Sequence, residues 1–357
     1  MIENNKERMM MLDKLYCGRT LYQGELHDHA NTGGTSDGAR SLEHWKGAME
    51  ALQMDFATIV DHRQVRHMYL PEWDSSIFIG GTEAGATMKT KLPDGEVLGG
   101  LHYNMLFSDP KELEGLLEEF TEFEFTGGPE GHFRYRSFTP ERFGELIDAV
   151  KRRGGFFVLP HPMQMSYGTN GQDYAFRDEV GIEVTYISLD CGCTEQNYEL
   201  WMDLLKRGKR MWVCAGGDKH QCAHDWALTS IYAEEKDSAC YLKHLRKGDF
   251  TAGPVGIQMC IGETPMGGIC KFEGQQLEIR VEGFHKSVKN PEHKFRLDVW
   301  ADEGIVHSQD ISCEESTYYA MDTEDCRFYR VEIYDVTKNL RIALGNPIWN
   351  CESTLEK

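Results

Sequence analysis

Histidine and carboxylate residues recur immediately after, or within, several short apolar segments of this sequence. The first segment leads into His27-Asp28-His29 and the second into Asp61-His62. Later segments carry Glu83, His102, His161, Asp218 and His220. Imidazole and carboxylate groups are ligands that suit Zn, Fe and Mn. Because one site of about four to six ligands cannot employ all of these groups, the sequence predicts two or three divalent metal ions (Mn, Zn or Fe) and no thiolate ligand.

The spacing inside two of these motifs places pairs of side chains on one face. Side chains alternate along an extended chain, so His27 and His29 point in the same direction. The same argument applies to Asp218 and His220, which are also separated by one residue. Two such groups on one face can share a metal ion. Arg63 and Lys219, each adjacent to a predicted ligand, are candidates for contact with a substrate phosphate.

Seven apolar or β-branched segments are predicted to be the strands that position these groups. They are Tyr22–Leu26, Phe56–Val60, Ile77–Gly80, Leu101–Phe107, Phe156–Leu159, Ile182–Ile187 and Met211–Ala215. Segments that are predicted to be helices lie between several of them, at Ser41–Leu52, Thr139–Arg153, Glu195–Arg207 and Ser238–Arg246. Alternating strands and helices are typical of β/α units around a parallel sheet or barrel, and barrels of this kind place their active sites where the strands end.

The character of the sequence changes after Thr251-Ala252-Gly253-Pro254. Four strand-like segments follow with hardly a helical window between them: Gln276–Val281, Lys294–Trp300, Cys326–Tyr334 and Leu340–Ala343. We therefore expect a β/α barrel over residues 1–255 and a small β-rich, sandwich-like domain over residues 256–357.

The charge balance bears on the binding partner. The chain has 357 residues, with 38 Lys and Arg against 58 Asp and Glu, so its formal net charge is −20. Such a charge repels a polyanion, which predicts that no nucleic acid polymer is bound. A small anionic substrate remains possible because divalent metal ions concentrate positive charge in one pocket.

The cysteine content and the absence of long apolar stretches bear on the cellular compartment of the protein. The 11 cysteines are odd in number and irregularly spaced, which argues against a disulfide framework and favours a reducing compartment. The first residues contain no long apolar segment, and no stretch of about 18 apolar residues occurs. The sequence predicts a cytoplasmic protein that does not contact a membrane; it makes no prediction of oligomeric state.

The order of the motifs HxH, DH, GTE, H, PHP and GGDxH resembles the PHP (polymerase and histidinol phosphatase) superfamily of metal-dependent hydrolases. This resemblance covers about residues 20–255. Leu245–Pro254 and Ala343–Trp349 are similar to the carbaryl-hydrolase-like (CehA/McbA) branch, which extends the likeness over nearly the whole chain. The resemblance implies an α/β fold: a distorted seven-stranded (β/α)7 barrel followed by a β-rich tail.

The resemblance also implies roles for individual residues. One metal is expected at His27, His29, Glu83 and Asp218, and Glu83 bridges to a second metal at His102 and His161. His62 and His220 are expected to bind a third metal, with Asp37 of Ser36-Asp37-Gly38 as their partner. The segment before Asp37 is longer than in the common form of the family, so a two-metal site also remains open. The expected catalytic residues are His27, His29, Glu83, His161, Asp218 and His220. Asp61 is expected to orient a ligand histidine.

Three functions are compatible with these motifs. The leading hypothesis is a metal-dependent phosphoesterase that hydrolyses a small phosphorylated metabolite, nucleotide-like phosphates included, with a metal-bridged hydroxide as nucleophile. The alternative is hydrolysis of a carboxylic ester or carbamate at the same site. The third is a non-catalytic carbohydrate- or protein-binding module, which is disfavoured because degeneration of the site would have erased some of the predicted ligands.

Overall fold

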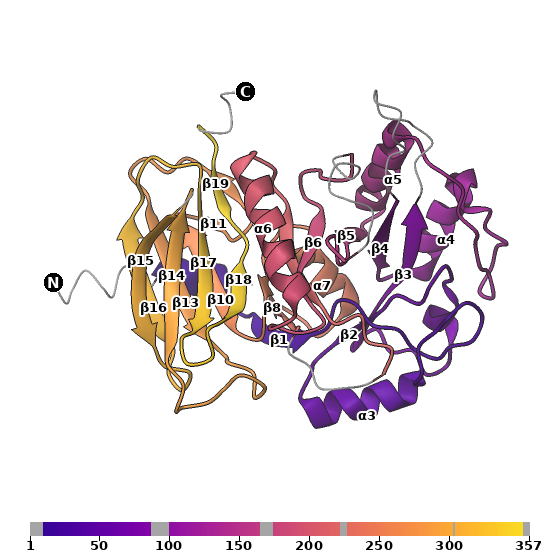
Figure 1. The fold of residues 1–357 in the computed structure, drawn as a ribbon, viewed down its shortest axis with the longest axis horizontal. Coiled ribbons are helices and arrows are strands. Elements are labelled where there is room, and N and C mark those ends of the chain that lie inside the picture. Colours follow the sequence, from indigo (N-terminus) through magenta and orange to yellow (C-terminus); the bar gives the residue numbers. More distant parts are fainter. Residues whose placement is uncertain (1–9, 87–99, 165–173, 222–226, 303, 353–357) are drawn as a thin grey trace.

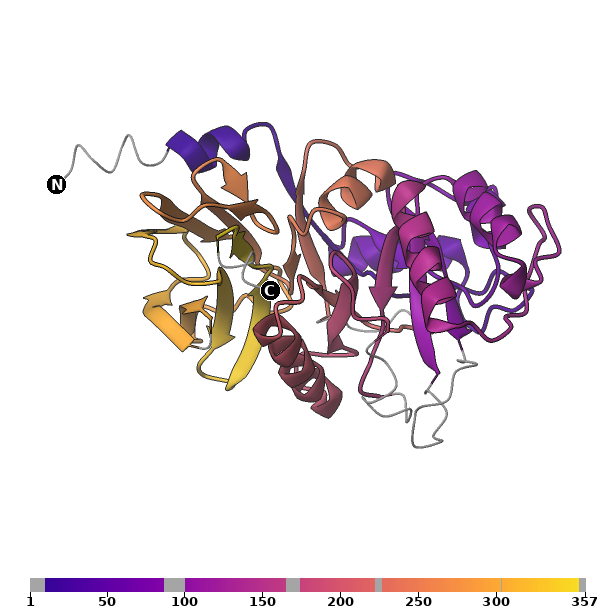
Figure 2. The same cartoon turned by 90° about the horizontal axis from the view of Figure 1, so that it is seen from above.

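The computed structural model describes residues 10–86, 100–164, 174–221, 227–302 and 304–352. Figures 1 and 2 show a curled sheet with helices at one end of the molecule and a β-rich part at the other. No helix in these ranges is long and apolar enough to span a bilayer. The architecture seen in Figures 1 and 2 is mixed α/β with β-rich regions, as the alternation of segments predicted.

A curled six-stranded sheet forms the part of the molecule that carries the motifs. Its strands, in spatial order, are β2 (Ala57–Ile59), β3 (Phe78–Ala86), β4 (Leu101–Phe107), β5 (Phe156–Leu159), β6 (Gly181–Tyr186) and β7 (Trp212–Gly216). The pairs β2–β3, β5–β6 and β6–β7 are parallel, whereas β4 runs antiparallel to both of its neighbours. The sheet is thus a half-barrel of mostly parallel strands.

The expected seven-stranded barrel is not confirmed, because the first predicted strand pairs elsewhere. Strand β1 (Thr20–Gly24) forms a five-residue antiparallel register with β8 (Thr229–Ala233) in a different sheet. The sequence-based prediction did not recognise β8, which is buried along its whole length. The end of β1 still lies beside the segment of β2, because Gly24 forms an isolated parallel bridge with Phe56.

The residues that follow β1 cross the gap between the two edge strands of the half-barrel. The backbone N–H of Asp28 donates to Thr58 O at 2.9 Å, and the N–H of His29 donates to Lys219 O at 2.8 Å. Asp28 forms isolated bridges with both Ile59 and Lys219. These contacts fix His27 and His29 between β2 and β7.

Alternation along the strands sorts side chains between the inside and the outside of the half-barrel. In β3, Ile79, Gly81 and Glu83 share one face, and in β4 His102 shares a face with Leu106. Near one end these inner faces are apolar, and Ile79 and Leu106 pack there with helix α7 (Ser238–Leu245). The polar residues lie toward the other end, so the half-barrel has one apolar end and one end that bears the motifs.

Helices cover the outside of the half-barrel. They are α3 (Leu42–Leu52), α4 (Pro110–Glu119), α5 (Pro140–Arg152) and α6 (Gly192–Lys206), and shorter helices occur at α2 (Met10–Leu15), η1 (Arg66–Tyr69) and η2 (Thr121–Phe123). Ser41 and Thr139 cap α3 and α5 with side-chain oxygens that accept backbone N–H groups, and Pro140 follows Thr139 at the first turn. The faces of α4, α5 and α6 that bear Leu116, Phe143 and Trp201 enter one core.

Two further sheets form the β-rich part. One has nine strands, with the order β1-β8-β9-β18-β17-β14-β15 and with β12 and β19 off this path; the other has the order β11-β10-β13-β16. Their remaining strands are β9 (Thr251–Ala252), β10 (Gly256–Ile261), β11 (Thr264–Pro265), β12 (Ile269–Cys270), β13 (Gln276–Glu282), β14 (Phe295–Ala301), β15 (Gly304–Ile311), β16 (Thr317–Asp322), β17 (Phe328–Asp335), β18 (Leu340–Gly345) and β19 (Ile348–Asn350). Met259 and Ile279 of the smaller sheet share a core with Leu297 and Val331 of the larger one. The nine-stranded sheet contains strands from both sides of position 255, and the division into 1–255 and 256–357 stays a prediction.

A buried polar cluster joins helix α6 to strand β17. Tyr198 Oη donates to Glu332 Oε1 at 2.5 Å, and the guanidinium of Arg330, which is fully buried, also donates to Glu332. Arg330 lies over the rings of Trp201 and Trp300, with 5.3 Å and 4.5 Å to the ring centroids. The β-rich part is therefore attached to helix α6 of the half-barrel by a charged, hydrogen-bonded contact.

Candidate metal centre

The predicted ligands lie together at the polar end of the half-barrel. Among the described residues, three groups of His, Asp and Glu there bring their ligand atoms within 4.8 Å of one another. The groups are His27, His29, Glu83 and Asp218; Glu83, His102 and His161; and His29, Asp37, His62 and His220. Every residue that the sequence analysis named as a metal ligand belongs to at least one of these groups.

The first group is the most buried. His27 Nε2 and His29 Nε2 are 3.3 Å apart, and Glu83 Oε2 is 3.2 Å from each of them. Asp218 Oδ1 lies 3.5 Å from His27 Nε2 and 3.1 Å from His29 Nε2. Ligand atoms placed tetrahedrally around a Zn²⁺ ion at the usual bond lengths lie about 3.3 Å from one another. The spacing of these four atoms therefore fits one divalent ion.

The second group uses the other oxygen of Glu83. Glu83 Oε1 lies 2.7 Å from His102 Nδ1 and 3.4 Å from His161 Nε2. Glu83 is almost fully buried at the end of the run of inward-facing residues in β3, whereas the His102 side chain is 33% exposed. One carboxylate thus faces two groups of imidazoles, an arrangement that suits a carboxylate shared by two metal ions.

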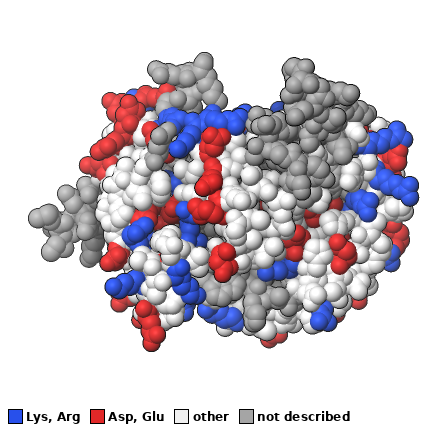
Figure 3. Space-filling model, viewed as in Figure 1, with Lys and Arg blue, Asp and Glu red and all other residues white. Residues whose placement is uncertain are grey.

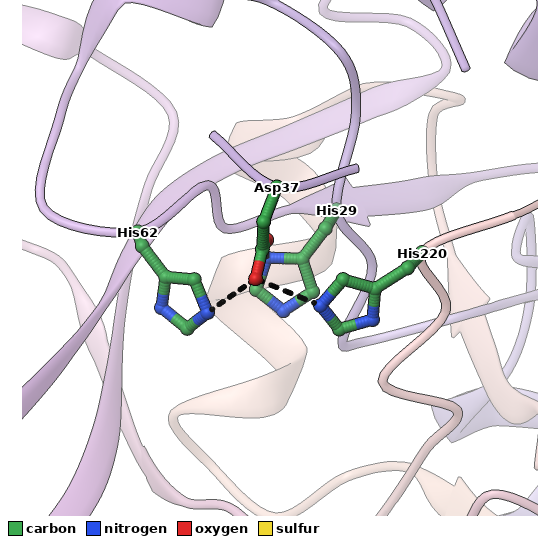
Figure 4. Close-up of side chains that lie close together, drawn as sticks. All are labelled: His29, Asp37, His62 and His220. Atoms are coloured by element: carbon green, nitrogen blue, oxygen red, sulfur yellow. Dashed lines mark ion pairs between the residues drawn. The ribbon is translucent and has the colours of Figure 1, made fainter. Parts of the chain in front are cut away.

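The third group, drawn in Figure 4, is more exposed than the first. Asp37 Oδ2 is 3.4 Å from His62 Nε2 and 3.2 Å from His220 Nε2, and Asp37 Oδ1 is 3.7 Å from His29 Nδ1. Side-chain exposure rises from 2% at Glu83 to 26% at His62, 38% at His220 and 51% at Asp37. The longer segment before Asp37 does not prevent this aspartate from approaching both histidines.

The electrostatics of the first group keep its carboxylates ionised. Burial by itself lowers the pKa of His27, but the carboxylates of Asp218, Glu183 and Glu83 outweigh burial and raise that pKa well above its ordinary value. Burial likewise opposes ionisation of Glu83 and Asp218, yet the neighbouring imidazoles hold the pKa of both carboxyls well below the ordinary range. Metal ligands must be deprotonated, so bound cations would replace the protons that these imidazoles hold.

Two residues that the sequence analysis did not assign contact the ligands directly. Glu183 Oε1 lies 3.2 Å from His27 Nδ1, and Tyr186 Oη donates to Asp218 Oδ2 at 2.8 Å. Both residues belong to β6, which was predicted as an apolar strand. A glutamate in the middle of a fully buried strand was the available signal, because a buried carboxylate requires partners that satisfy it.

Asp61 does not have the role that was expected of it. Its Oδ1 accepts the backbone N–H of Ala30 at 2.8 Å, and its Oδ2 accepts from the Thr32 hydroxyl. His67 Nδ1 lies 3.7 Å from Asp61 Oδ2, and His67 belongs to none of the three groups. The carboxylate of Asp61 therefore fixes the loop after His29, and Glu183 occupies the place beside a ligand histidine.

The two predicted phosphate contacts are placed differently. The Lys219 ammonium donates to Ile187 O at 3.1 Å, on the loop after β6. Arg63 is half-buried and has a left-handed backbone with φ 55°. Its carbonyl accepts the N–H of Phe133 and its own N–H donates to Glu83 O. The backbone of Arg63 thus supports the strand end that carries Glu83, and substrate contact by either side chain stays a prediction.

A fourth group, Glu234, Cys240 and His244, lies at a different place, at helix α7. Lys243 and Arg19 pair with Glu234 at 3.2 and 3.6 Å, and His244 lies 3.1 Å from Asp249. These cationic partners already offset the charge of Glu234, so the group is explained as an ion-pair network.

Comparisons with known proteins give a limited result. No protein-family model matches the sequence, and no curated protein matches it. Among solved structures, Endonuclease Q in complex with a 27-mer duplex substrate with an abasic lesion at the active site is similar at 12% identity and a TM-score of 0.44, over 64% of this chain and 57% of that chain. The lesion-specific endonuclease PfuEndoQ from Pyrococcus furiosus is similar at 10% identity and a TM-score of 0.41, over 64% and 56%. The chain thus spans a little more than half of the length of these two proteins.

The prediction that nucleic acid polymers are excluded as partners is contradicted by the first of these structures, which holds duplex DNA. The prediction treated the net charge of −20 as a uniform repulsive surface. On the face shown in Figure 3, Lys and Arg side chains are interspersed with Asp and Glu. Because the field near a binding site depends on local charges and bound cations, net charge alone does not exclude a polyanion.

Proposed function

We propose that this protein is a metal-dependent phosphoesterase whose site is formed by the three groups of residues at the polar end of the half-barrel. The observation that carries the proposal is the position of Glu83, whose Oε2 faces His27 and His29 while its Oε1 faces His102 and His161. A carboxylate shared in this way holds two cations close together. The motif resemblance to the PHP superfamily supports the same chemistry, and membership of the carbaryl-hydrolase-like branch stays a prediction.

Divalent ions bound in these groups would lower the pKa of coordinated water and offset negative charge on a phosphoryl oxygen. The chain's own residues supply the shape of the site. The buried His27, His29 and Glu83 form its floor, and the more exposed Asp37, His102 and His220 form a rim that a substrate can reach. We propose a small phosphorylated molecule as the substrate, because cations in these three groups would be sufficient to bind its phosphate.

The test combines metal content with hydrolysis. Protein purified without chelator is analysed by inductively coupled plasma mass spectrometry and assayed with Mn²⁺, Zn²⁺ and Fe²⁺ against p-nitrophenyl phosphate, bis(p-nitrophenyl) phosphate and p-nitrophenyl acetate. We expect two to three metal equivalents and turnover of a phosphate ester. Turnover of the acetate alone would overturn the proposal in favour of carboxylic ester hydrolysis, and absence of metal after soaking would overturn both.

Asp218→Asn provides the site variant, and Asp298→Asn is a matched control. Asp298 is a buried aspartate of β14 that accepts hydrogen bonds from Arg296 and Ser308, away from the metal-binding groups. Asp218→Asn is expected to lower kcat/KM by at least about 100-fold, whereas Asp298→Asn retains activity at temperatures where it is folded. Equal losses in both variants would indicate that the activity depends on general stability.

The substrate class is resolved by a second panel. Nucleoside monophosphates, sugar phosphates and a duplex oligonucleotide with one abasic position are compared at equal concentration. Preference for a small phosphate ester supports the proposed substrate. Cleavage of the duplex with a higher kcat/KM would retain the phosphoesterase and replace its substrate with a nucleic acid phosphodiester.

A further inference from the structure

The carboxylate of Glu183 contacts two of the three metal-binding groups from behind. Glu183 is 1% exposed in the middle of β6. Its Oε1 lies 3.2 Å from Nδ1 of His27, and its Oε2 accepts the backbone N–H of His161 at 2.9 Å. His27 belongs to the first group and His161 to the second. One buried side chain therefore connects residues from both groups that share Glu83.

The contact with His27 determines which imidazole nitrogen faces the centre. A carboxylate oxygen accepts the hydrogen bond, so the contact holds a proton on Nδ1 and makes Nε2 the nitrogen that can bind a cation once its own proton is released. Nε2 of His27 is the atom that lies 3.2 Å from Glu83 and 3.5 Å from Asp218. Carboxylates that orient ligand histidines in this way are a common feature of metal sites.

The contact with His161 acts on the backbone. His161 has φ 32°, in the left-handed region that a residue with a side chain rarely adopts. Such a conformation costs free energy and persists where surrounding contacts fix it. The hydrogen bond from the His161 N–H to Glu183 supplies one of these contacts, and the same residue then presents Nε2 to Glu83 at 3.4 Å.

The neighbouring strand is shaped to accommodate this carboxylate. The β6–β7 register shifts between Glu183 and Thr185, and such irregularities redirect side chains. A Cβ atom on Gly216 would lie 2.0 Å from Glu183 Oε1 and 2.7 Å from His27 Cβ. Only glycine at position 216 leaves room for the contact between Glu183 and His27.

We propose that Glu183 is a positioning residue that holds His27 and His161 in the arrangement their two groups need to bind metal. The inference rests on the proposed function only in that these groups bind cations; it does not depend on which ester is hydrolysed. It predicts that changes at Glu183 alter metal affinity in the protein before any substrate is present.

The experiment measures metal binding by isothermal titration calorimetry of the metal-free full chain with Zn²⁺ and with Mn²⁺. Glu183→Gln keeps the side-chain volume, but it replaces one of the two accepting oxygens with an amide nitrogen that donates, so only one of the two hydrogen bonds can remain. We expect the affinity of the tightest sites to fall about 10- to 100-fold. Gly216→Ala crowds the same carboxylate from the neighbouring strand β7 and is also expected to lower the metal affinity.

Glu332→Gln is the matched control, because Glu332 is an equally buried glutamate whose partners are Arg330 and Tyr198. It should lower the melting temperature without changing metal affinity. Spectra of imidazole nitrogens in ¹⁵N-histidine-labelled protein give a second readout: Glu183→Gln should shift the Nδ1 signal of one buried histidine, and Glu332→Gln should not.

The outcomes separate this inference from the proposed function. Unchanged metal affinity and unchanged imidazole nitrogen signals in a folded Glu183→Gln protein would overturn the inference even if the protein hydrolyses phosphate esters. Weaker metal binding in that variant, in a protein that hydrolyses no phosphate ester, would retain the inference and overturn the proposed function. Absence of metal binding by the unaltered chain would overturn both.

Discussion

Tyr186 Oη donates a 2.8 Å hydrogen bond to Asp218 Oδ2, while Asp218 Oδ1 faces His27 and His29. The two oxygens of this carboxylate thus have separate roles, one fixed by a phenol and one directed at the centre. Burial, followed by the charge of Asp218, raises the pKa of Tyr186, so the hydroxyl stays protonated and continues to donate.

Tyr186→Phe is expected to weaken metal binding about tenfold, because Asp218 loses the donor that orients it. The ring should remain in place, since it packs against His161 with 5.0 Å between ring centroids. Calorimetric titration with Zn²⁺ measures the effect. Tyr103→Phe is the matched control: the buried Tyr103 hydroxyl has no hydrogen-bond partner among the described residues, and its removal should leave the affinity unchanged.

Asp37→Asn is expected to remove one metal equivalent and leave the others. Asp37 is the carboxylate that approaches both His62 and His220, while the first two groups retain Glu83 and Asp218. Metal content after dialysis, measured by mass spectrometry, checks this prediction against Asp203→Asn, an exposed aspartate of α6. A metal content equal to that of the unaltered chain would show that Asp37 is not a ligand and that the site holds fewer ions.

Arg330→Ala is expected to lower the free energy of unfolding by about 3 kcal/mol, because it leaves the buried carboxylate of Glu332 without its closest guanidinium. Arg341 Nε, at 3.3 Å from Glu332 Oε2, compensates only in part. Urea denaturation followed by circular dichroism measures the loss. Arg207→Ala removes an exposed arginine whose ion pair with Asp203 spans 3.4 Å, and it should change stability by less than about 0.5 kcal/mol. Similar losses in the two variants would contradict the structural role of the buried cluster.

Glu278→Gln is expected to stabilise the protein more at pH 8 than near pH 4.5. Burial raises the pKa of Glu278 above its ordinary value of 4.5, so the folded state holds this proton more tightly than the unfolded state. The contribution of Glu278 to stability therefore falls as the pH rises from 4.5 through the raised pKa. Glutamine does not titrate, and the difference in melting temperature between variant and unaltered protein should shrink as the pH falls. The same substitution at the exposed Glu292 should show no such trend.

The strands were largely predictable from the sequence, but their pairing was not. Apolar segments such as Leu101–Phe107 and Phe156–Leu159 coincide with β4 and β5. Periodicity reports which residues are buried and carries no information on direction, so the antiparallel placement of β4 was not anticipated. The pairing of β1 with β8 was not anticipated, because the two strands lie more than 200 residues apart in the chain.

The candidate site was predictable where ligands follow strand ends in recognisable motifs. His27 and Glu83 meet at 3.2 Å, as the motif order implied. Residues that act behind the ligands were missed, because Glu183 and Tyr186 lie inside a strand whose other residues are apolar. Their function depends on which strand lies beside β6, and that information is absent from local spacing.

The nine-stranded sheet has a consequence for how the chain folds. β1 pairs with β8, which lies more than 200 residues later in the chain, and β9 pairs with β18, whose residues begin at Leu340. Tyr16 donates a hydrogen bond to Asp249, and Arg280 donates one to Asp13, both across more than 200 residues of sequence. Contacts between distant parts of a chain slow folding because long loops must close first. The sheet that contains β1 therefore cannot be completed until the chain has been synthesised through β19, which ends at Asn350.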